Sequence, residues 1–303
     1  NEKILDGRIY KIAQPEKDEL LITIKVSGAQ YRLMLCADAS LPLLYLTQEN
    51  KKSPMTAPNF CMLLRKHLQN GRIVAVTQPG LERVIQFDIE HLDEMGDLCK
   101  KTLAMELMGK HSNIIFYDDQ KKILDSIKHI SGMVSSVREV LPGRTYFIPE
   151  TTDKADFIKN PNTVGEFCNI IKQKAMPLYK SIYCSYVGIS PILAQEICYR
   201  AGVDADFPAN ALSGEQAEKL QIAFEEFVTE VNQREFTPHI IYDEQQTPVE
   251  FGVLPFSIYR ENPKTEFDSI SEVLFTYYAQ KSAKTRIRQK SADLHRILSL
   301  KIV

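Results

Sequence analysis

Residues 103–117 read LAMELMGKHSNIIFY, two apolar runs joined by a short polar segment that contains glycine. This pattern predicts a β-hairpin, because a tight turn between two strands favours glycine and small polar residues. The tip of the hairpin would carry Lys110 and His111, followed by Ser112 and Asn113. A solvated turn is the common explanation of such a tip, so the pattern predicts a structure here and leaves its function open.

The first half of the chain predicts a mainly antiparallel β domain over residues 1–160, because it contains many short apolar runs separated by turn residues. One helix is expected between Ser53 and Asn70, with Pro58 in its first turn and Gly71 just after its end. The strands are expected as several short runs within residues 4–46 and near residues 72–78, 81–90, 100–108, 113–118 and 122–128.

Helical periodicity dominates residues 161–235. Residues 236–262 revert to strand character, which suggests that the last strands rejoin the first sheet and that the helical part is an insertion. No glycine or proline follows Asp268, so residues 263–303 are expected to hold the start of a long helix that is cut off at the end of the chain. The expected fold class is therefore α+β, an antiparallel β domain with an inserted helical domain.

Residues 186–197 read YVGISPILAQEI and resemble a helix-hairpin-helix motif. Gly188 permits a tight turn, and Pro191 suits the first turn of the next helix. The backbone N–H groups of Gly188, Ile189 and Ser190 would then lie at a helix N-terminus, where a phosphate is favoured whatever the base sequence. A helix pair that only packs is the alternative. Ser190 stands where the motif usually has a second glycine, which narrows the room for a phosphate.

Several motifs in one order resemble the NFACT family of ribosome-associated quality-control proteins, long known as fibronectin-binding proteins. They are the hairpin tip at 108–113 and the segments 4–12, 60–68, 80–85, 125–130 and 138–143. The order of so many motifs is much more specific than any one of them. The resemblance implies an NFACT N-terminal domain, a helix-hairpin-helix domain over 161–235 and the first helix of a coiled coil over 263–303.

The resemblance also implies a site for transfer RNA. Glu82-Arg83 stands where the family usually has Asp-Arg, a pair implicated in handling tRNA, and the signature tip adds Lys110 and His111. Glutamate keeps the charge of aspartate but lengthens the side chain by one methylene. From the residues alone, an exposed salt bridge at a strand end is the ordinary explanation of Glu82-Arg83. Arg83 could otherwise bind a phosphate through its two-pronged guanidinium.

The partners and the process are implied by the family as well. Its bacterial members bind stalled 50S ribosomal subunits, recruit alanyl-tRNA and promote untemplated alanine tails on nascent chains. Peptide-bond formation belongs to the ribosome, so this chain would position RNA and would not be an enzyme. The formal net charge is −2, so any RNA binding must use local patches. One such patch is the basic last helix with Lys284 and Arg288, for which rRNA is a natural partner.

Metal, cofactor and membrane sites are not expected. The six cysteines are dispersed, without a Cys-x-x-Cys pair or neighbouring histidines, so zinc-ligand spacing is missing. No glycine-rich phosphate loop or other cofactor motif occurs. No apolar run reaches the roughly eighteen residues that a membrane helix needs. Dispersed cysteines suit a reduced protein, so a cytoplasmic location is expected.

Two other functions stay open. A surface adhesin that binds fibronectin fits the older name of the family, although no export signal, anchor motif or adhesin-type repeat is visible. A DNA glycosylase of the formamidopyrimidine type resembles the family in its plan. That chemistry needs an N-terminal proline, a neighbouring glutamate and a zinc finger, whereas this chain begins Asn1-Glu2-Lys3 and lacks a zinc set.

Overall fold

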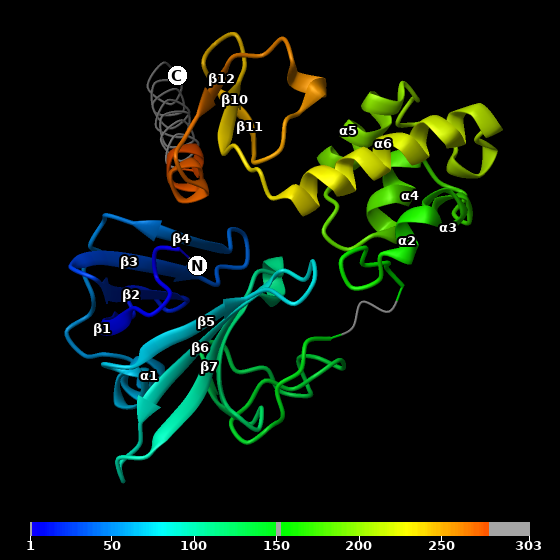
Figure 1. Ribbon diagram of the computed structural model, residues 1–303. Helices are drawn as coiled ribbons and strands as arrows, with labels where there is room; N and C mark the ends of the chain where they lie inside the picture. The colour runs from blue at the N-terminus through cyan, green and yellow to red at the C-terminus, as the bar shows by residue number, and fades with distance from the viewer. Residues whose placement is uncertain (1, 150–152, 279–303) are drawn as a thin grey trace, which may run out of the picture.

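The computed structural model describes residues 2–149 and 153–278 (Figure 1). Its largest element is a nine-stranded antiparallel sheet in the order β4-β3-β2-β1-β5-β6-β7-β8-β9, which confirms the mainly antiparallel β prediction for the first part of the chain. Only β1 and β5 are neighbours without being consecutive in sequence. The strands are β1 (Arg8–Ala13), β2 (Glu19–Val26), β3 (Ala29–Cys36), β4 (Leu43–Thr47), β5 (Arg72–Thr77), β6 (Val84–Leu92), β7 (Leu98–Glu106), β8 (Asn113–Asp118) and β9 (Ile123–Ser126).

Helix α1 (Asn59–Leu68) packs against β1, β6 and β9 of this sheet. It begins later than the expected Ser53, because Pro58 is the N-cap residue and lies in extended conformation. Its end is as predicted, with Asn70 in the left-handed region at a φ of 66° just before Gly71. The side chains that α1 buries are Phe60, Cys61, Leu64 and Leu68.

The predicted hairpin forms from β7 and β8, with Met105 opposite Ile114 and Ala104 opposite Ile115. Met105 and Ile114 join the core around α1, whereas Ala104 and Ile115 pack with Tyr146 on the other face of the sheet. Both faces are therefore buried here. This explains why the two strands are continuous apolar runs and not alternating ones.

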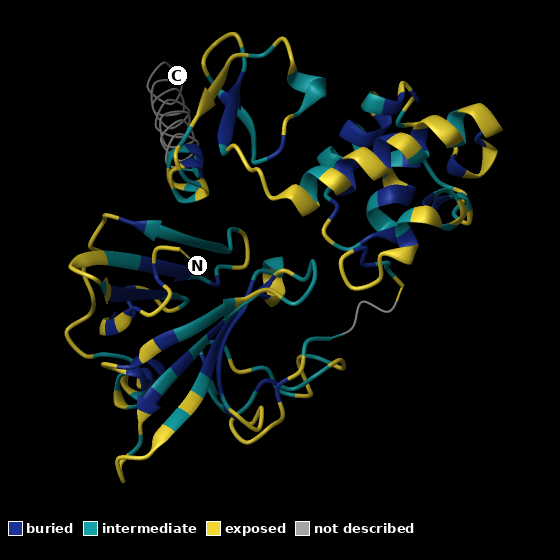
Figure 2. Cartoon of the chain, in the orientation of Figure 1, coloured by how far each residue is buried: buried dark blue, intermediate teal, exposed yellow. Residues whose placement is uncertain are grey.

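The region from residue 162 to residue 233 is helical, as predicted, and has an aromatic core. The rings of Phe167 and Phe224 stack with 4.0 Å between their centroids, and Tyr186 packs on Phe224 at 5.0 Å. Figure 2 shows that the longest helix keeps an exposed outer face. The elements are α2 (Asn162–Gly165), α3 (Phe167–Lys172), α4 (Leu178–Ser185), α5 (Pro191–Ala201), η2 (Ala209–Ala211) and α6 (Gly214–Gln233).

The last strands form a sheet of their own, so the prediction that residues 236–262 return to the first sheet is wrong. Strand β10 (His239–Tyr242) pairs with β11 (Pro248–Gly252) on one edge and with β12 (Lys264–Glu266) on the other. Both edges of β10 are thus occupied by strands that lie close in sequence, and a short turn, η3 (Ser257–Tyr259), precedes β12. Along the chain, the helical region consequently follows the strands of one sheet and precedes those of another, and it is not an insertion into a single sheet (Figure 1).

A final helix begins after β12 and is described over residues 270–278. Val273 and Tyr277 of this helix are buried against the three-stranded sheet. The helix therefore covers one face of the small sheet, and this contact gives the three strands the buried apolar face that a small sheet needs for stability. The predicted RNA-binding residues Lys284 and Arg288, and any coiled coil beyond them, lie outside the described residues.

Candidate functional site

The hairpin tip presents Lys110 and His111 to solvent. Both belong to η1 (Gly109–His111), a single 3-10 turn between β7 and β8, and both are exposed. The backbone N–H of Leu107 donates a hydrogen bond to the carbonyl of Arg83 at 2.8 Å. This bond ties the base of the tip to the start of β6, so the tip and Arg83 lie together at the same end of strands β6 and β7.

The other polar residues of the tip are structural. The Ser112 hydroxyl accepts a hydrogen bond from the backbone N–H of Met108 at 2.8 Å, which closes the turn. The amide of Asn113 donates to the carbonyl of Lys128 at 2.9 Å and accepts from its N–H at 3.1 Å. Because Ser112 and Asn113 are both buried, only Lys110 and His111 of this motif are available to a partner.

The turn before β6 places Glu82 and Arg83 in different environments. The Glu82 side chain is only 12% exposed, and its Oε1 lies 3.5 Å from Nζ of Lys159. Arg83 is exposed, and no carboxylate of the described residues forms an ion pair with its guanidinium. The ordinary alternative, a salt bridge at a strand end, therefore applies to Glu82, whose partner Lys159 is half-exposed, but not to Arg83. Glu82 is neutralised within the protein, and Arg83 is left available to an external anion.

The turn between α4 and α5 bends at Gly188, whose φ is +79°. A Cβ built on Gly188 would lie 2.9 Å from the Cβ of Leu81, so this glycine permits close contact with the turn that carries Glu82 and Arg83. Ile189 is buried at 6% exposure. The close approach at Gly188 and the side chain of Ile189 therefore serve packing.

The backbone of the same turn nevertheless offers hydrogen-bond donors. Within the described residues, the N–H groups of Gly188, Ile189 and Ser190 have no acceptor. The Ser190 hydroxyl caps α5 by accepting a hydrogen bond from the N–H of Leu193 at 3.3 Å. Three free donors thus precede a capped helix of eleven residues, an arrangement that suits an anion.

Three motifs that are remote in sequence meet at this end of strands β6 and β7, beside the helical region (Figure 1). The hydrogen bond from Leu107 to Arg83 joins the hairpin tip to the turn before β6. The contact between Leu81 and Gly188 joins that turn to the helical region. The predicted site residues gathered at this end of β6 and β7 are Glu82, Arg83, Lys110, His111, Gly188, Ile189 and Ser190.

Sequence reasoning missed two residues of this candidate site, Asp156 and Lys159. Asp156 Oδ2 accepts a hydrogen bond from the N–H of Leu81 at 3.0 Å, and Lys159 pairs with Glu82. Both lie in the link between the sheet and the helices. No local pattern distinguishes them, because what defines their role is a contact with a turn far away in the sequence.

A buried charge pair supports the hairpin from below. Glu106 has no exposed surface, and its carboxylate pairs with the guanidinium of Arg138 and accepts a hydrogen bond from the Tyr146 hydroxyl at 3.0 Å. The rings of Tyr146 and Tyr117 stack at 4.3 Å. Burial raises the pKa of Tyr117 to about 12 and raises the pKa of Tyr146 as well, so both hydroxyls stay protonated at neutral pH.

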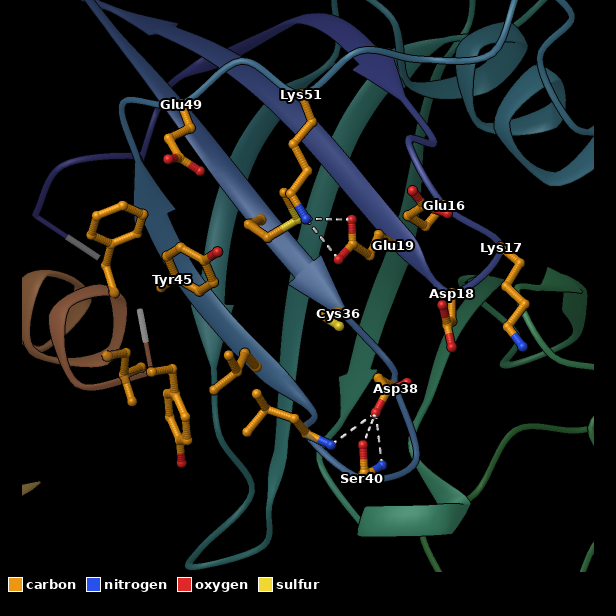
Figure 3. A pocket seen from close by; sticks show the side chains of 16 residues that line it. Glu16, Lys17, Asp18, Glu19, Cys36, Asp38, Ser40, Tyr45, Glu49 and Lys51 are labelled. Carbon is orange, nitrogen blue, oxygen red and sulfur yellow. Dashed lines mark hydrogen bonds and ion pairs between the residues drawn. The ribbon is translucent and has the colours of Figure 1, made fainter. Parts of the chain in front are cut away.

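A large cavity of the described structure lies elsewhere and has the wrong charge for RNA. It measures about 780 Å³ and lies between β2–β4 and the helix over 270–278 (Figure 3). Nζ of Lys51 is 2.9 Å from both oxygens of Glu19, and hydrogen bonds from Ser40 lower the pKa of Asp38. Among the predicted site residues that the structure describes, none lines this cavity. Its charged lining residues are Glu16, Lys17, Asp18, Glu19, Asp38, Glu49 and Lys51.

Across 2–149 and 153–278, no group of three or more His, Cys, Asp or Glu side chains is placed to hold a metal ion. Over those ranges no helix has both the length and the apolar character that crossing a bilayer requires. None of the six cysteines forms a disulfide.

Comparison with known sequences identifies relatives over the whole described chain. The family model of NFACT N-terminal and middle domains matches residues 1–302. The Rqc2 homolog RqcH of Bacillus subtilis (strain 168) is 33% identical over 299 residues, and that of Streptococcus suis (strain 05ZYH33) is 31% identical over 293 residues. These matches cover 98% and 95% of this chain but 50% and 47% of the relatives. The chain thus spans about half the length of the relatives it matches.

Solved structures share the fold. The fibrinogen binding protein from Staphylococcus aureus superposes with a TM-score of 0.75 at 27% identity, covering 91% of this chain and 93% of that one. The N-terminal part of the fibronectin/fibrinogen-binding protein from Streptococcus suis gives a TM-score of 0.68 at 28% identity, with the same coverage of both chains. The arrangement of sheets and helices is therefore common to these proteins.

Proposed function

Because the chain belongs to the NFACT family, we propose that it acts in ribosome-associated quality control by binding RNA on the large ribosomal subunit. The family membership supports a role in ribosome-associated quality control. The groups around Arg83, at the end of β6 and β7, support the binding of RNA. The 50S subunit, its rRNA and tRNA, including alanyl-tRNA, are the proposed partners. The proposed location is the cytoplasm, where these partners are found.

The observation that carries this proposal is that Arg83, the hairpin tip and the turn at Gly188 meet at one end of β6 and β7. Arg83 offers a planar guanidinium that has no partner among residues 2–149 and 153–278. Lys110 adds a second cation, and the turn adds backbone N–H groups that are free within the same ranges. All three bind phosphate oxygens without reading bases. A nucleic-acid backbone carries a phosphate at every nucleotide, so one RNA strand could supply an anion to each of these groups.

The proposed role is to position RNA and not to catalyse a reaction. In this proposal the pair α4–α5 acts as a helix-hairpin-helix, and the final helix is the first arm of a coiled coil. The whole protein would hold tRNA so that the ribosome extends the stalled nascent chain with untemplated alanines. Binding through phosphates suits this role, because it fixes the orientation of an RNA whatever its sequence.

Co-sedimentation of the full-length protein with 50S subunits tests the proposal. Arg83→Gln combined with Lys110→Gln should move the protein from the 50S fraction to the top of a sucrose gradient, because two of the three phosphate contacts are lost. The matched control is Arg260→Gln, a 69% exposed arginine near the small sheet, which should leave the distribution unchanged. Normal co-sedimentation of the double variant would contradict the proposed site.

Binding to fibronectin or fibrinogen is the second candidate function. The names of the structural neighbours from Staphylococcus aureus and Streptococcus suis favour it. Surface plasmon resonance with immobilised human fibronectin would decide between the two. Saturable fibronectin binding that survives Arg83→Gln, together with absence of 50S binding, would favour the adhesin.

A further inference from the structure

The carboxylate of Asp156 connects the sheet to the helical region through the turn that carries Arg83. Its Oδ2 accepts a hydrogen bond from the backbone N–H of Leu81 at 3.0 Å. Its Oδ1 accepts from the N–H groups of Ile158 at 2.9 Å and Lys159 at 3.1 Å. Asp156 is 9% exposed, so all these bonds are shielded from water. A buried, charged acceptor with three backbone donors is a strong anchor.

The same anchor brings Lys159 to Glu82. Nζ of Lys159 lies 3.5 Å from Glu82 Oε1 and 3.9 Å from Asp156 Oδ2, so one ammonium group serves two carboxylates. Lys159 is half-exposed, whereas Glu82 is mostly covered. Glu82 therefore does not compete for the guanidinium of Arg83, its neighbour in sequence. The guanidinium of Arg83 therefore stays available to an external phosphate.

Another residue of the turn, Gly80, also permits the close contact with Asp156 and Lys159. Gly80 has a φ of +57°, and a Cβ there would lie 2.5 Å from Asp156 Oδ2 and 2.6 Å from Cε of Lys159. Only glycine allows so close an approach in this conformation. Next to it, the side chain of Leu81 rests against Gly188. The turn is thus held by the link on one face and by the α4–α5 turn on the other.

We infer that Asp156 is a positioning residue for Arg83, and that it acts by clamping the turn over residues 79–82 onto the helical region. This inference rests on the proposed function, because it concerns how Arg83 meets tRNA. Downstream of the clamp, the carbonyl of Arg83 is fixed by Leu107. With both sides of Arg83 held, its backbone is ordered before RNA arrives, so binding does not incur the entropic cost of ordering it.

A double-mutant cycle on tRNA binding tests this inference in the full-length protein. Arg83→Gln should weaken binding at low salt about tenfold, the usual effect of one charge-assisted phosphate contact. Asp156→Ala should weaken binding about three- to tenfold in the wild-type background, because Arg83 is no longer ordered. In the Arg83→Gln background Asp156→Ala should have almost no effect, because the residue through which it acts is absent.

Three controls keep the result interpretable. Asp156→Asn retains one acceptor oxygen and should restore part of the affinity, and thermal unfolding checks that each variant is folded. Asp204→Ala removes an exposed carboxylate that also accepts a backbone hydrogen bond in the helical region, and it should leave binding unchanged. Amide hydrogen exchange at Leu81 should accelerate in Asp156→Ala, because that N–H loses its acceptor.

The outcomes separate the two proposals. If Arg83→Gln binds tRNA as wild type does, the proposed function fails and the inference falls with it. If Arg83→Gln weakens binding while Asp156→Ala has no effect, only the inference is overturned. Equal losses from Asp156→Ala in both backgrounds would also overturn it, because they would show a general effect on folding and no action through Arg83.

Discussion

Gly188 and Leu81 lie in contact across the boundary between the sheet and the helices. A Cβ on Gly188 would come within 2.9 Å of the Cβ of Leu81 and within 3.3 Å of one of its methyl groups. Leu81 packs in turn against the buried core of the helical region. The two candidate phosphate-binding turns are therefore held in a fixed relation, and a change at either one should affect the other.

Gly188→Ala should destabilise the protein more than Gly202→Ala does. Both glycines have positive φ values, +79° and +65°, so either alanine incurs about 1 kcal/mol of backbone strain. Only at Gly188 does the new methyl also meet Leu81, whereas Gly202 faces open space. We expect an additional loss of about 1 to 2 kcal/mol for Gly188→Ala in urea unfolding. Equal losses would mean that the two parts do not press together at Leu81.

Ser190→Asp should weaken RNA binding, whereas Ser190→Asn should not. Aspartate and asparagine cap helices about as well as serine, so both variants should keep the stability of α5. Aspartate alone places a negative charge in front of the free N–H groups of Gly188 and Ile189, where it would repel a phosphate. Filter binding with tRNA at low salt measures the difference. Identical affinities for the two variants would assign this turn to packing alone.

Arg138→Met should cost about 3 kcal/mol or more of unfolding free energy. The substitution leaves the Glu106 carboxylate buried with only the Tyr146 hydroxyl as a partner, and unpaired buried charges are strongly destabilising. Arg144→Met is the matched control. Arg144 is 61% exposed and pairs with Glu139 at the surface, so its loss should cost less than about 1 kcal/mol. A small effect of Arg138→Met would contradict the stabilising role of the buried Glu106–Arg138 pair.

Stability should fall at alkaline pH because of the buried tyrosines. The pKa of Tyr117 is raised from 10.0 to about 12 by burial, so its stabilising contribution is complete below pH 10 and is lost as the pH rises through 12. In the unfolded chain the hydroxyl ionises first, which favours unfolding. Urea unfolding at pH 8 and pH 11 should differ by on the order of 1 to 2 kcal/mol more in wild type than in Tyr117→Phe. The same difference in both proteins would refute this origin.

Local features of the fold were predictable from sequence, because they depend on neighbouring residues. The hairpin around Gly109 and the turn at Asn70 that follows α1 were predicted from turn chemistry and from continuous apolar runs. Strand pairing in the last part was not predictable in this way. The pattern of β10 shows that it is a strand, but not whether its partners are β11 and β12 or the first sheet, since that choice is made by tertiary packing.

The candidate site was predictable in its residues but not in its connections. The family resemblance pointed to Glu82, Arg83 and the turn at Gly188 separately. Nothing in the sequence indicated that Glu82 is covered and paired with Lys159, or that Asp156 holds the turn. These are single contacts between distant segments, and they leave no periodicity or spacing by which they could be found.

The salt dependence of tRNA binding by the 1–303 chain tests the central claim most directly. Because the net charge is −2, binding should be weak and limited to a local patch, with a slope of log affinity against log salt equivalent to roughly two to four phosphates. Arg83→Gln should reduce that slope by about 0.7 to 0.9, the contribution of one phosphate, while Arg260→Gln should leave it unchanged. An unchanged slope in Arg83→Gln, or binding that does not depend on salt, would contradict the account.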